Sequence, residues 1–408
     1  MNERMVIVDG VRTPFCKSGT DLSAFSADDL GRIAVNALLT RTGLDPALVD
    51  EVIFGCVAQP MEAANIARVI ALRAGIPESV PAATVHRNCA SGFEAFTTAY
   101  ERMAAGRGSI YIVGGTESMS HVPLLFQEAT ARKFTDLAKS KSTAQKLGAL
   151  SAFRVADFEP RAGLKLGLTD PVCGLNMGET AELLAREDGI TREQQDAFAL
   201  QSHQRALAAE ARLSEEMCPV FIGGKALLRD NGPRSDQSMS VLGNLRPVFE
   251  KYGTVTAGNS SQITDGAVAL LLMTESRARE LGFQPLGVLT AYAYAGCDPA
   301  RMGLGPVAAI ERLTKFSPLT LADADLVEIN EAFAAQVLAV LSRLKPGIPP
   351  DKLNVNGGAI ALGHPVGATG ARLVLSSLKE LARRQAKRAL VTLCVGGGQG
   401  GAIWLERI

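Results

Sequence analysis

The same order of elements, a helix followed by a strand and a glycine-rich turn, occurs twice in the chain. A helical pattern over 91–105 leads into a strand-like run at 109–113 and a pair of glycines. A second helical pattern over 368–385 leads into a strand-like run at 389–393 and another glycine-rich turn. A chain that repeats such a plan is expected to fold as two related α/β units.

A second pair of matching segments supports this interpretation. Residues 50–54 resemble residues 325–329, and the two matches follow each other in the same order along the chain. Any α/β protein repeats its plan to some extent, so one match alone would mean little. Two matches in the same order favour a duplicated half.

Short runs rich in β-branched residues alternate with helical patterns. The runs at 6–8, 52–54 and 110–113 predict buried strands, and the patterns over 26–41 and 91–105 predict amphipathic helices. This alternation predicts an α/β fold with parallel strands. With 408 residues, of which 47% are hydrophobic, the chain can bury a large core in two or three domains.

The overall composition narrows the classes of partner. Lys plus Arg and Asp plus Glu number 42 each, and because nucleic-acid binding requires a basic surplus we expect no nucleic acid among the partners. Seven dispersed cysteines without CxxC or HxxxH spacing predict neither a disulfide framework nor a metal site. Without a signal-peptide pattern or an apolar run near ~18 residues, we expect no transmembrane span and a cytoplasmic location.

Residues 120–255 differ in character from the rest of the chain. Segment 131–165 carries eight basic and three acidic residues, and segment 178–213 is strongly helical. Thr191 and Gln194 predict a capping box at a helix start. We interpret 120–255 as an insertion that folds over the site. The charged stretch is either a solvated helical face or a surface for a polyphosphate ligand.

Cys89 is a candidate nucleophile. A strand-like run ends at Val85 and a helical pattern begins soon after Cys89. At a helix N-terminus, unpaired backbone N–H groups and the positive end of the dipole favour the thiolate. The alternative is a buried structural cysteine, which is the commoner case.

Two glycine-rich segments carry further candidate groups. His364 lies in a segment over 354–370 that contains five glycines, and it could accept the proton of a cysteine nucleophile. Cys394 ends a strand and is followed by glycines, so its thiol could act as an acid or base in a crevice. Asn330 follows another strand and could hold a water or an oxyanion, although an ordinary helix N-cap is the simpler interpretation.

Six motifs in this order resemble those of the thiolase family over the whole chain. They are Arg12-Thr13-Pro14-Phe15, Asn88-Cys89-Ala90-Ser91-Gly92, Gly258-Asn259-Ser260-Ser261, Asn330-Glu331-Ala332-Phe333, Asn356-Gly357-Gly358 through Gly363-His364-Pro365, and Cys394-Val395-Gly396-Gly397-Gly398. The resemblance implies duplicated halves in an α-β-α-β-α layered sandwich with an inserted loop domain. The N-terminal half would span 1–280, with the insertion at about 120–255, and the C-terminal half would span 281–408.

The resemblance also implies the reaction and its catalytic groups. A 3-oxoacyl-CoA would be cleaved by CoA to acetyl-CoA and a shortened acyl-CoA, or formed by the reverse Claisen condensation. Cys89 would carry the acyl group, His364 would activate Cys89, and Cys394 would move the proton at C2. Asn330 would hold a water at the enolate oxygen, and the N–H groups of Gly396 and Cys89 would stabilise tetrahedral intermediates. No metal or bound cofactor is implied, because coenzyme A is a substrate.

Substrate contacts and partners follow from the same resemblance. The implied substrate-binding residues are Ser261, Met177, Ala332 and Phe333. A homodimer or homotetramer is expected, and the basic segment 131–165 is similar to thiolases that work with a hydratase/dehydrogenase partner.

Two departures from the family patterns leave the acyl-chain length and the direction of the reaction open. Many short-chain members carry His where this chain has Asn176. Members of oxidation complexes often carry His where this chain has Asn330.

Two other functions are compatible with a fold of this kind. A decarboxylating ketoacyl synthase uses one Cys and two His, whereas this chain has Asn330 and Cys394 at the corresponding places. A non-catalytic CoA-binding assembly subunit would not need the full set of catalytic residues that this chain retains.

Overall fold

The computed structural model describes residues 3–408, and its centre is a mixed sheet of ten strands. The strands are β1 (Met5–Arg12), β2 (Cys16–Lys17), β3 (Glu51–Gly55), β4 (Ala82–Val85), β5 (Ile110–Ser118), β10 (Thr264–Thr274), β11 (Gly287–Gly296), β12 (Leu326–Ile329), β13 (Arg388–Val395) and β14 (Gln399–Arg407). Their order is β12-β13-β14-β11-β1-β10-β5-β3-β4, with β2 paired to β10. The order β3-β5-β10-β1 is mirrored by β12-β13-β14-β11, so the predicted duplication is confirmed.

The expectation of parallel strands is correct for only part of the sheet. β3 pairs in parallel with β4 and β5, and β12 pairs in parallel with β13. β10 and β14 run antiparallel to β5 and β13. β13 and β14 are joined by a short turn at Gly396–Gly398, which permits only antiparallel pairing. The alternation of helices and strands could not reveal these returning strands.

Fifteen helices cover the sheet or belong to the insertion in the described chain. They are α1 (Ala27–Thr42), α2 (Ile66–Arg73), α3 (Ser91–Ala104), α4 (Glu128–Lys139), α5 (Thr143–Ser151), α6 (Gly163–Gly167), α7 (Met177–Glu187), α8 (Arg192–Ala208), α9 (Glu210–Ser214), α10 (Met239–Gly243), α11 (Glu275–Glu280), α12 (Gly305–Leu313), α13 (Ala334–Arg343), α14 (Ala359–Leu362) and α15 (Val366–Arg384). None of the described helices is both long and apolar enough to cross a bilayer. The predicted capping box of Thr191 and Gln194 is present at the start of α8.

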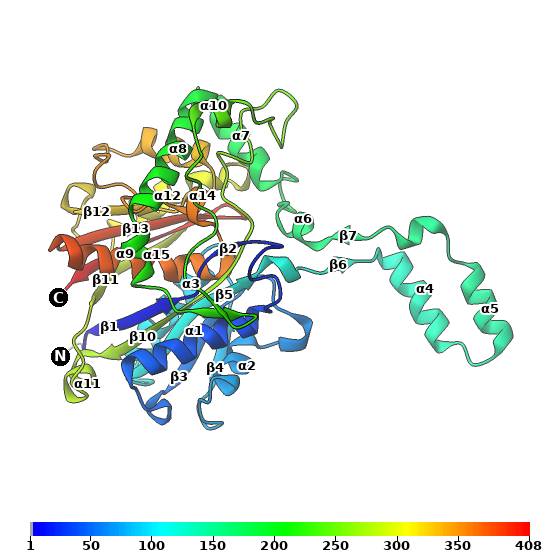
Figure 1. The fold of residues 1–408 in the computed structure, drawn as a ribbon, viewed down its shortest axis with the longest axis horizontal. Helices are drawn as coiled ribbons and strands as arrows, with labels where there is room; N and C mark the ends of the chain where they lie inside the picture. The colour runs from blue at the N-terminus through cyan, green and yellow to red at the C-terminus, as the bar shows by residue number, and fades with distance from the viewer. Residues whose placement is uncertain (1–2) are drawn as a thin grey trace.

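The helices and the two half-sheets form five layers (Figure 1). α1 and α2 cover the outer face of the first half-sheet, and α12 and α13 cover that of the second. α3 and α15 lie between the half-sheets, and α15 contacts strands of both. Among residues 3–408, the half-sheets are joined only where β1 pairs with β11, at Val6–Val288 and Ile7–Gly287. The expected α-β-α-β-α sandwich is therefore present.

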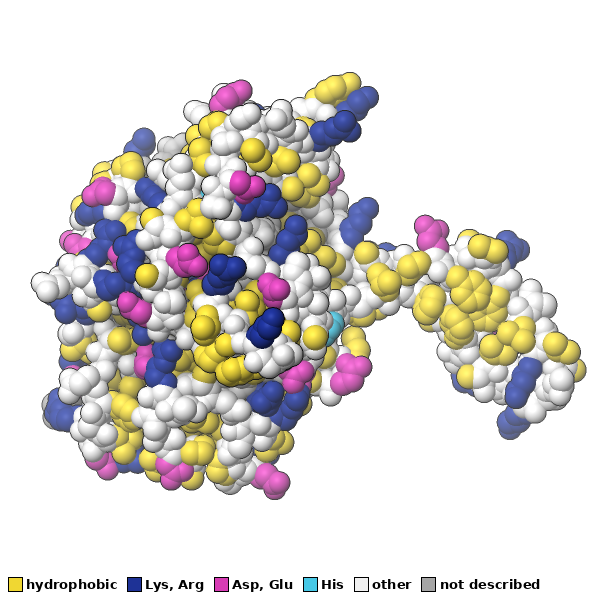
Figure 2. All heavy atoms as spheres, in the orientation of Figure 1, with side chains coloured by type: hydrophobic (Ala, Val, Ile, Leu, Met, Phe, Trp, Pro, Cys, Tyr) yellow, Lys and Arg dark blue, Asp and Glu magenta, His cyan; other side chains and the backbone are white. Residues whose placement is uncertain are grey.

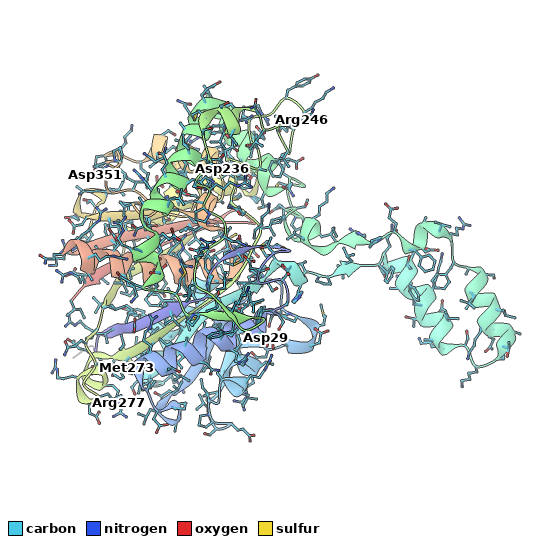
Figure 3. The ribbon with its side chains drawn as sticks, viewed as in Figure 1. Asp29, Asp236, Arg246, Met273, Arg277 and Asp351 are labelled. Atoms are coloured by element: carbon cyan, nitrogen blue, oxygen red, sulfur yellow. The ribbon has the colours of Figure 1, made fainter. Side chains whose placement is uncertain are left out.

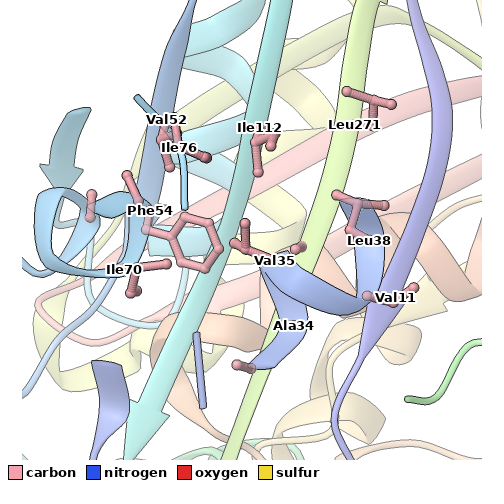
Figure 4. Packing of buried hydrophobic residues seen from close by; sticks show 14 of the residues in the cluster. Val11, Ala34, Val35, Leu38, Val52, Phe54, Ile70, Ile76, Ile112 and Leu271 are labelled. Atoms are coloured by element: carbon pink, nitrogen blue, oxygen red, sulfur yellow. The ribbon is translucent and has the colours of Figure 1, made fainter. Parts of the chain in front are cut away.

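The outer layer of the first half shows why the sequence folds in this way. Val35 and Leu38 of α1 pack on Phe54, Ile112 and Leu271 of three neighbouring strands (Figure 4). All five side chains are fully buried. Burying one such side chain stabilises the fold by about 1.5–3 kcal/mol.

Capping interactions fix the ends of α1. Ser26 caps its N-terminus by accepting from the Asp29 N–H, and Gly43 ends it with a φ of 65°. Asp29 lies in the first turn (Figure 3), where its charge is favourable toward the helix dipole. It also pairs with Arg73 of α2 at 2.6 Å. The predicted helix over 26–41 thus lies within one residue of the observed one.

α3 and α15 approach each other closely at their N-terminal ends. A Cβ at Gly92 of α3 would lie 2.6 Å from the Ala371 backbone nitrogen. A Cβ at Gly370 of α15 would lie 2.5 Å from the Phe93 backbone nitrogen. These glycines permit backbone contact between the two central helices.

The insertion connects β5 to β10, which are neighbours in the sheet. Two of its helices, α4 and α5, project from the body on the short hairpin of β6 (Leu124–Leu125) and β7 (Arg161–Ala162) (Figure 1). We call residues 126–160 the arm. Our expectation that the whole insertion folds over the site is wrong for the arm. Four phenylalanine rings pack on one another and give the arm a small core of its own. They are Phe126, Phe134, Phe153 and Phe158.

We propose residue 280 as the boundary between the halves, because α11 ends there and β11, the first strand of the second half-sheet, follows.

Replacing Gly370 with alanine tests the contact between the central helices. Helix propensity alone would make the change stabilising, but the new methyl group meets the Phe93 backbone at 2.5 Å. We expect the free energy of unfolding to fall by about 1–3 kcal/mol.

Chemical denaturation measures this loss, and Gly148→Ala in α5 is the matched control. A Cβ at Gly148 meets no atom within 4 Å, so this change should stabilise α5 by about 0.5–1 kcal/mol. Equal unfolding midpoints for the Gly370 variant and the wild type would contradict the proposed contact.

Candidate active site

Four of the predicted catalytic residues line one cavity of about 550 Å³. They come from three separate parts of the chain: Cys89 before α3, His364 before α15, and Cys394 and Gly396 at the end of β13. Asn330 does not line the cavity but lies behind His364, with 3.5 Å between its Nδ2 and the imidazole Nε2. The structure therefore brings together all five groups.

The loop that carries Cys89 is short and internally bonded. It connects β4 to α3, and the Ser91 hydroxyl accepts from the Arg87 N–H at 2.9 Å and donates to the Asn88 carbonyl at 2.7 Å. Asn88 has a φ of 43°, a left-handed conformation that Asn adopts more readily than most residues. These contacts hold Cys89 at the cavity.

Burial controls the protonation of Cys89. Desolvation raises the pKa of the Cys89 thiol, and the backbone N–H groups of Gly396 and of Cys89 itself oppose that rise. The backbone N–H groups thus favour the thiolate, as expected, but desolvation outweighs them and the pKa of the thiol lies above its ordinary value. The thiol needs a base.

His364 can be that base, and its neighbours define which nitrogen is basic. Thr369 Oγ1 donates to the Pro365 carbonyl at 3.0 Å and lies 2.7 Å from His364 Nδ1. A hydroxyl has one proton, so Nδ1 carries a hydrogen and donates to Thr369, which leaves the lone pair on Nε2. Burial, aided by the positive charge of Arg372, lowers the pKa of His364 to about 3. The imidazole is therefore neutral at physiological pH.

Cys394 is suited to proton donation. It is buried at the end of β13, and desolvation, together with the adjacent Cys89, raises its pKa well above the ordinary value. The backbone N–H of Gly396, two residues on, acts to lower the pKa of the Cys89 thiol. A Cβ at Gly396 would lie 3.2 Å from Met177 Sδ, so a side chain there would narrow the cavity.

Asn330 is held rigidly by its neighbours. Its N–H donates to the Thr392 carbonyl at 3.0 Å. The next residue, Glu331, is buried and accepts from Ser202 Oγ at 2.6 Å. Asn330 Oδ1 is buried and accepts no hydrogen bond from the described residues. It is not a helix N-cap, because α13 begins only at Ala334. A buried polar atom of this kind is suited to bind a small polar ligand or a water.

The predicted substrate-binding residues line the same cavity, namely Ser261, Met177, Ala332 and Phe333. The Ser261 N–H donates to the Ala332 carbonyl at 2.9 Å, so two distant motifs are joined at the cavity wall. The Phe333 ring contacts Phe249 edge-on at 6.0 Å. Asn176, where many short-chain thiolases carry His, caps the N-terminus of α7 and also lines the cavity.

A second cavity of about 370 Å³ also reaches Cys89. Most of its wall is apolar, contributed by the ends of β3 and β5 and by the part of the insertion next to α6. The lining residues away from the first cavity include Val57, Ala58, Val122, Pro171 and Val172. Cys89 therefore stands where two cavities meet.

Sequence reasoning missed Glu117, Met119 and Thr369. Glu117 is buried at the end of β5 and accepts from the N–H groups of Val57, Ala58 and Gly367, so it ties the wall of the second cavity to α15. The sequence feature that could have indicated Glu117 is a lone acidic residue at the end of an apolar strand-like run. Thr369 lies within the glycine-rich segment. Its contact with His364 Nδ1 could not be predicted, because the fold sets which nitrogen faces the hydroxyl.

No group of three or more His, Cys, Asp or Glu side chains placed to hold a metal ion occurs between residues 3 and 408.

Comparisons with known proteins agree with this fold. Models of the thiolase N-terminal and C-terminal domains match residues 5–276 and 283–407. The chain is 41% identical to a 3-ketoacyl-CoA thiolase of Serratia proteamaculans over 99% of this chain and 97% of that protein. It is 42% identical to an acetyl-CoA acetyltransferase of Allochromatium vinosum over 100% of both chains.

Solved structures give the same result. The Bacillus anthracis acetyl-CoA acetyltransferase superposes with a TM-score of 0.90 at 37% identity, covering 100% of both chains. The human mitochondrial 3-ketoacyl-CoA thiolase in complex with CoA has the same TM-score and identity, covering 100% of this chain and 98% of that chain.

The duplicated five-layer fold defines a class of α/β enzymes with two related halves. Within that class, the family models and the full-length relatives show that the chain belongs to the thiolase family. The resemblance drawn from the six motifs is thus confirmed, and the chain is an acyltransferase.

The pH dependence of Cys89 alkylation tests the electrostatics of the site. Because the thiol pKa is raised and that of His364 is lowered, the rate with iodoacetamide should keep rising above pH 8.5. No inflection is expected near pH 6.5, where an unshifted histidine would titrate. Mass spectrometry of the Cys89 peptide follows the reaction, and a rate that is already constant by pH 7.5 would contradict this assignment.

Proposed function

We propose that this thiolase cleaves 3-oxoacyl-CoA with free CoA, using Cys89 as the nucleophile. The observation that carries the proposal is the position of Cys89, at the meeting point of two cavities and beside His364 and Cys394. One cavity would hold the pantetheine of CoA and the other the acyl chain. The reverse condensation uses the same groups.

The first half-reaction forms the acyl-cysteine. His364 Nε2 takes the thiol proton of Cys89, and the sulfur attacks C3 of the substrate. The resulting alkoxide accepts hydrogen bonds from the Cys89 and Gly396 N–H groups. The C2–C3 bond then breaks, and the electron pair moves into the enolate of acetyl-CoA. Protonated His364 and a water on Asn330 Oδ1 stabilise the enolate oxygen, and the Cys394 thiol protonates C2.

The second half-reaction releases the shortened acyl-CoA. The Cys394 thiolate takes the proton of an incoming CoA thiol, and the CoA sulfur attacks the acyl-cysteine. The same two N–H groups stabilise the second tetrahedral intermediate. As it collapses, Cys89 leaves and recovers its proton from His364. Both sulfurs and the imidazole then return to their starting states.

The mouth of the larger cavity has the charge that CoA requires. Lys17 and Lys165 line it and are exposed, so both can reach the phosphates of CoA. The other basic residues of segment 131–165 lie on or beside the arm, which projects away from the body (Figure 2). We therefore assign Lys17 and Lys165, and not the arm, to phosphate binding.

The second cavity supports acyl chains longer than C4. A 3-oxo C4 substrate ends one methyl group beyond C3, whereas a space of about 370 Å³ with a mainly apolar wall extends from Cys89. Each further CH₂ buried there contributes about 0.8 kcal/mol. We therefore propose medium-chain 3-oxoacyl-CoA as the preferred substrate class.

Thiolysis assays with free CoA test this function. We expect wild-type protein to cleave C4, C8 and C16 3-oxoacyl-CoA, with kcat/KM at least ~10-fold higher for C8 than for C4. Cys89→Ser should lower turnover by a factor of about 1,000 or more. Turnover of the serine variant at the wild-type rate would contradict the assignment, and absence of CoA-dependent cleavage by the wild type would favour a decarboxylating synthase.

Val57→Phe separates chain length from catalysis. The larger ring fills part of the second cavity, so activity on C8 should fall while activity on C4 is retained. Val172→Phe is the control, because Val172 is 82% exposed at the edge of the same cavity. Equal losses on C4 and C8 would place the acyl chain elsewhere.

We also propose that the chain forms a homodimer and that the arm binds a hydratase/dehydrogenase partner. Within the described chain, β4 pairs only with β3, so its second edge offers free backbone groups to a second copy. The arm exposes apolar side chains that include Leu147 and Leu150, at 62% and 51%. A dehydrogenase is the class of enzyme that must supply a 3-oxoacyl-CoA from its 3-hydroxy form.

Sedimentation velocity tests this assembly with a Leu147→Glu/Leu150→Glu variant. The variant should remain a dimer with normal turnover but lose the complex that the wild type forms with a purified hydratase/dehydrogenase. A variant that still forms the complex would exclude this face of the arm, and a monomeric wild type would contradict pairing through β4.

A further inference from the structure

Asn88 is placed between the two groups that donate the oxyanion hydrogen bonds. Its side-chain Nδ2 donates to the Gly396 carbonyl at 2.7 Å. Its own carbonyl belongs to the same peptide group as the Cys89 N–H. Asn88 therefore touches Gly396 through its side chain and Cys89 through its backbone.

This contact crosses the boundary between the two halves of the protein. Cys89 belongs to the loop before α3, and Gly396 belongs to the turn between β13 and β14. A second side-chain contact between these segments, from Arg87 Nη1 to Gln399 Oε1, is longer at 3.3 Å. The two N–H groups must point at one oxygen, although no covalent segment shorter than about 300 residues joins them.

The backbone of Asn88 serves the same contact. Its φ of 43° is left-handed, and Asn adopts this conformation at low cost. Gly397 and Gly398 on the opposite side are also left-handed, with φ values of 90° and 77°. A Cβ at Gly397 would lie 3.7 Å from Asn88 Nδ2, so the amide lies directly against this turn.

We propose that Asn88 is a positioning residue that sets the relative placement of the Cys89 and Gly396 N–H groups. This inference rests on the proposed function, since it concerns the oxyanions of that reaction. By holding the peptide group between Gly396 and Gly397, on the other side of the Gly396 Cα from the N–H donor, the amide fixes the turn before substrate arrives. A hydrogen-bond donor stabilises a developing oxyanion only when it is already aimed at the position of the charge.

Asn88 contributes a left-handed backbone and a side-chain amide donor, and variants can separate the two. Asn88→Gly keeps the left-handed backbone and removes the amide donor. Asn88→Asp keeps the size and the backbone preference of the side chain but presents an oxygen to the Gly396 carbonyl. Both variants should lower kcat by ~10–100-fold, because misplacing one donor costs part of what its removal costs. KM should change little, since the oxyanion exists only in the transition state and intermediates.

Alkylation of Cys89 distinguishes positioning from general damage. Iodoacetamide is displaced by sulfur with loss of iodide and forms no oxyanion. The Asn88→Gly protein should therefore be alkylated at the wild-type rate while its thiolysis of 3-oxoacyl-CoA is slow. Gln385→Gly is the matched control, because Gln385 is an exposed left-handed residue at the end of α15, with a φ of 52°.

Each outcome decides the question. Slow turnover with normal alkylation in Asn88→Gly, and slow turnover in Asn88→Asp, would support the inference. Wild-type turnover in Asn88→Gly would overturn it, because the amide would then have no role. A parallel fall in alkylation and turnover would also overturn it, because Asn88 would then be placing the sulfur. Thiolysis by the wild-type protein tests the proposed function separately, because it does not depend on the Asn88 variants.

Discussion

The close contact between α3 and α15 is the interaction on which the site depends. Gly92 and Gly370 allow the two helix backbones to meet near their N-terminal ends. Cys89 lies two residues before α3 and His364 two residues before α15, so the contact places the nucleophile next to its base. The duplicated halves thus contribute equivalent helices to one buried layer. Without this layer, each half would carry only part of the catalytic set.

The helix ends alone do not ionise Cys89, so the site also needs a base and a group that orients that base. The N–H donors offset only part of the desolvation at Cys89, so the sulfur stays protonated until His364 acts. Thr369 in turn fixes the hydrogen on His364 Nδ1 and leaves Nε2 basic. Burial therefore suppresses charge in the resting site, and hydrogen bonding decides where protons can move.

Much of this arrangement could be predicted from the sequence. Cys89 stood near the start of a helix and Cys394 at the end of a strand, where α/β folds place functional groups, and His364 lay in a glycine-rich segment. The matching segments also predicted the duplicated halves. Local patterns could not show that β10 returns antiparallel to β5, because the long insertion separates the two strands in the sequence, whereas the short glycine turn before β14 was a signal that the prediction of parallel strands did not use. Glu117 was missed for a similar reason, since its partners lie in two distant segments.

The raised pKa values of both catalytic sulfurs have a consequence for the lifetime of the enzyme. Peroxides oxidise thiolates much faster than thiols, and the first product is a sulfenic acid. Burial favours the thiol form of both Cys89 and Cys394. The burial that raises both pKa values would therefore also slow oxidation of the two catalytic sulfurs.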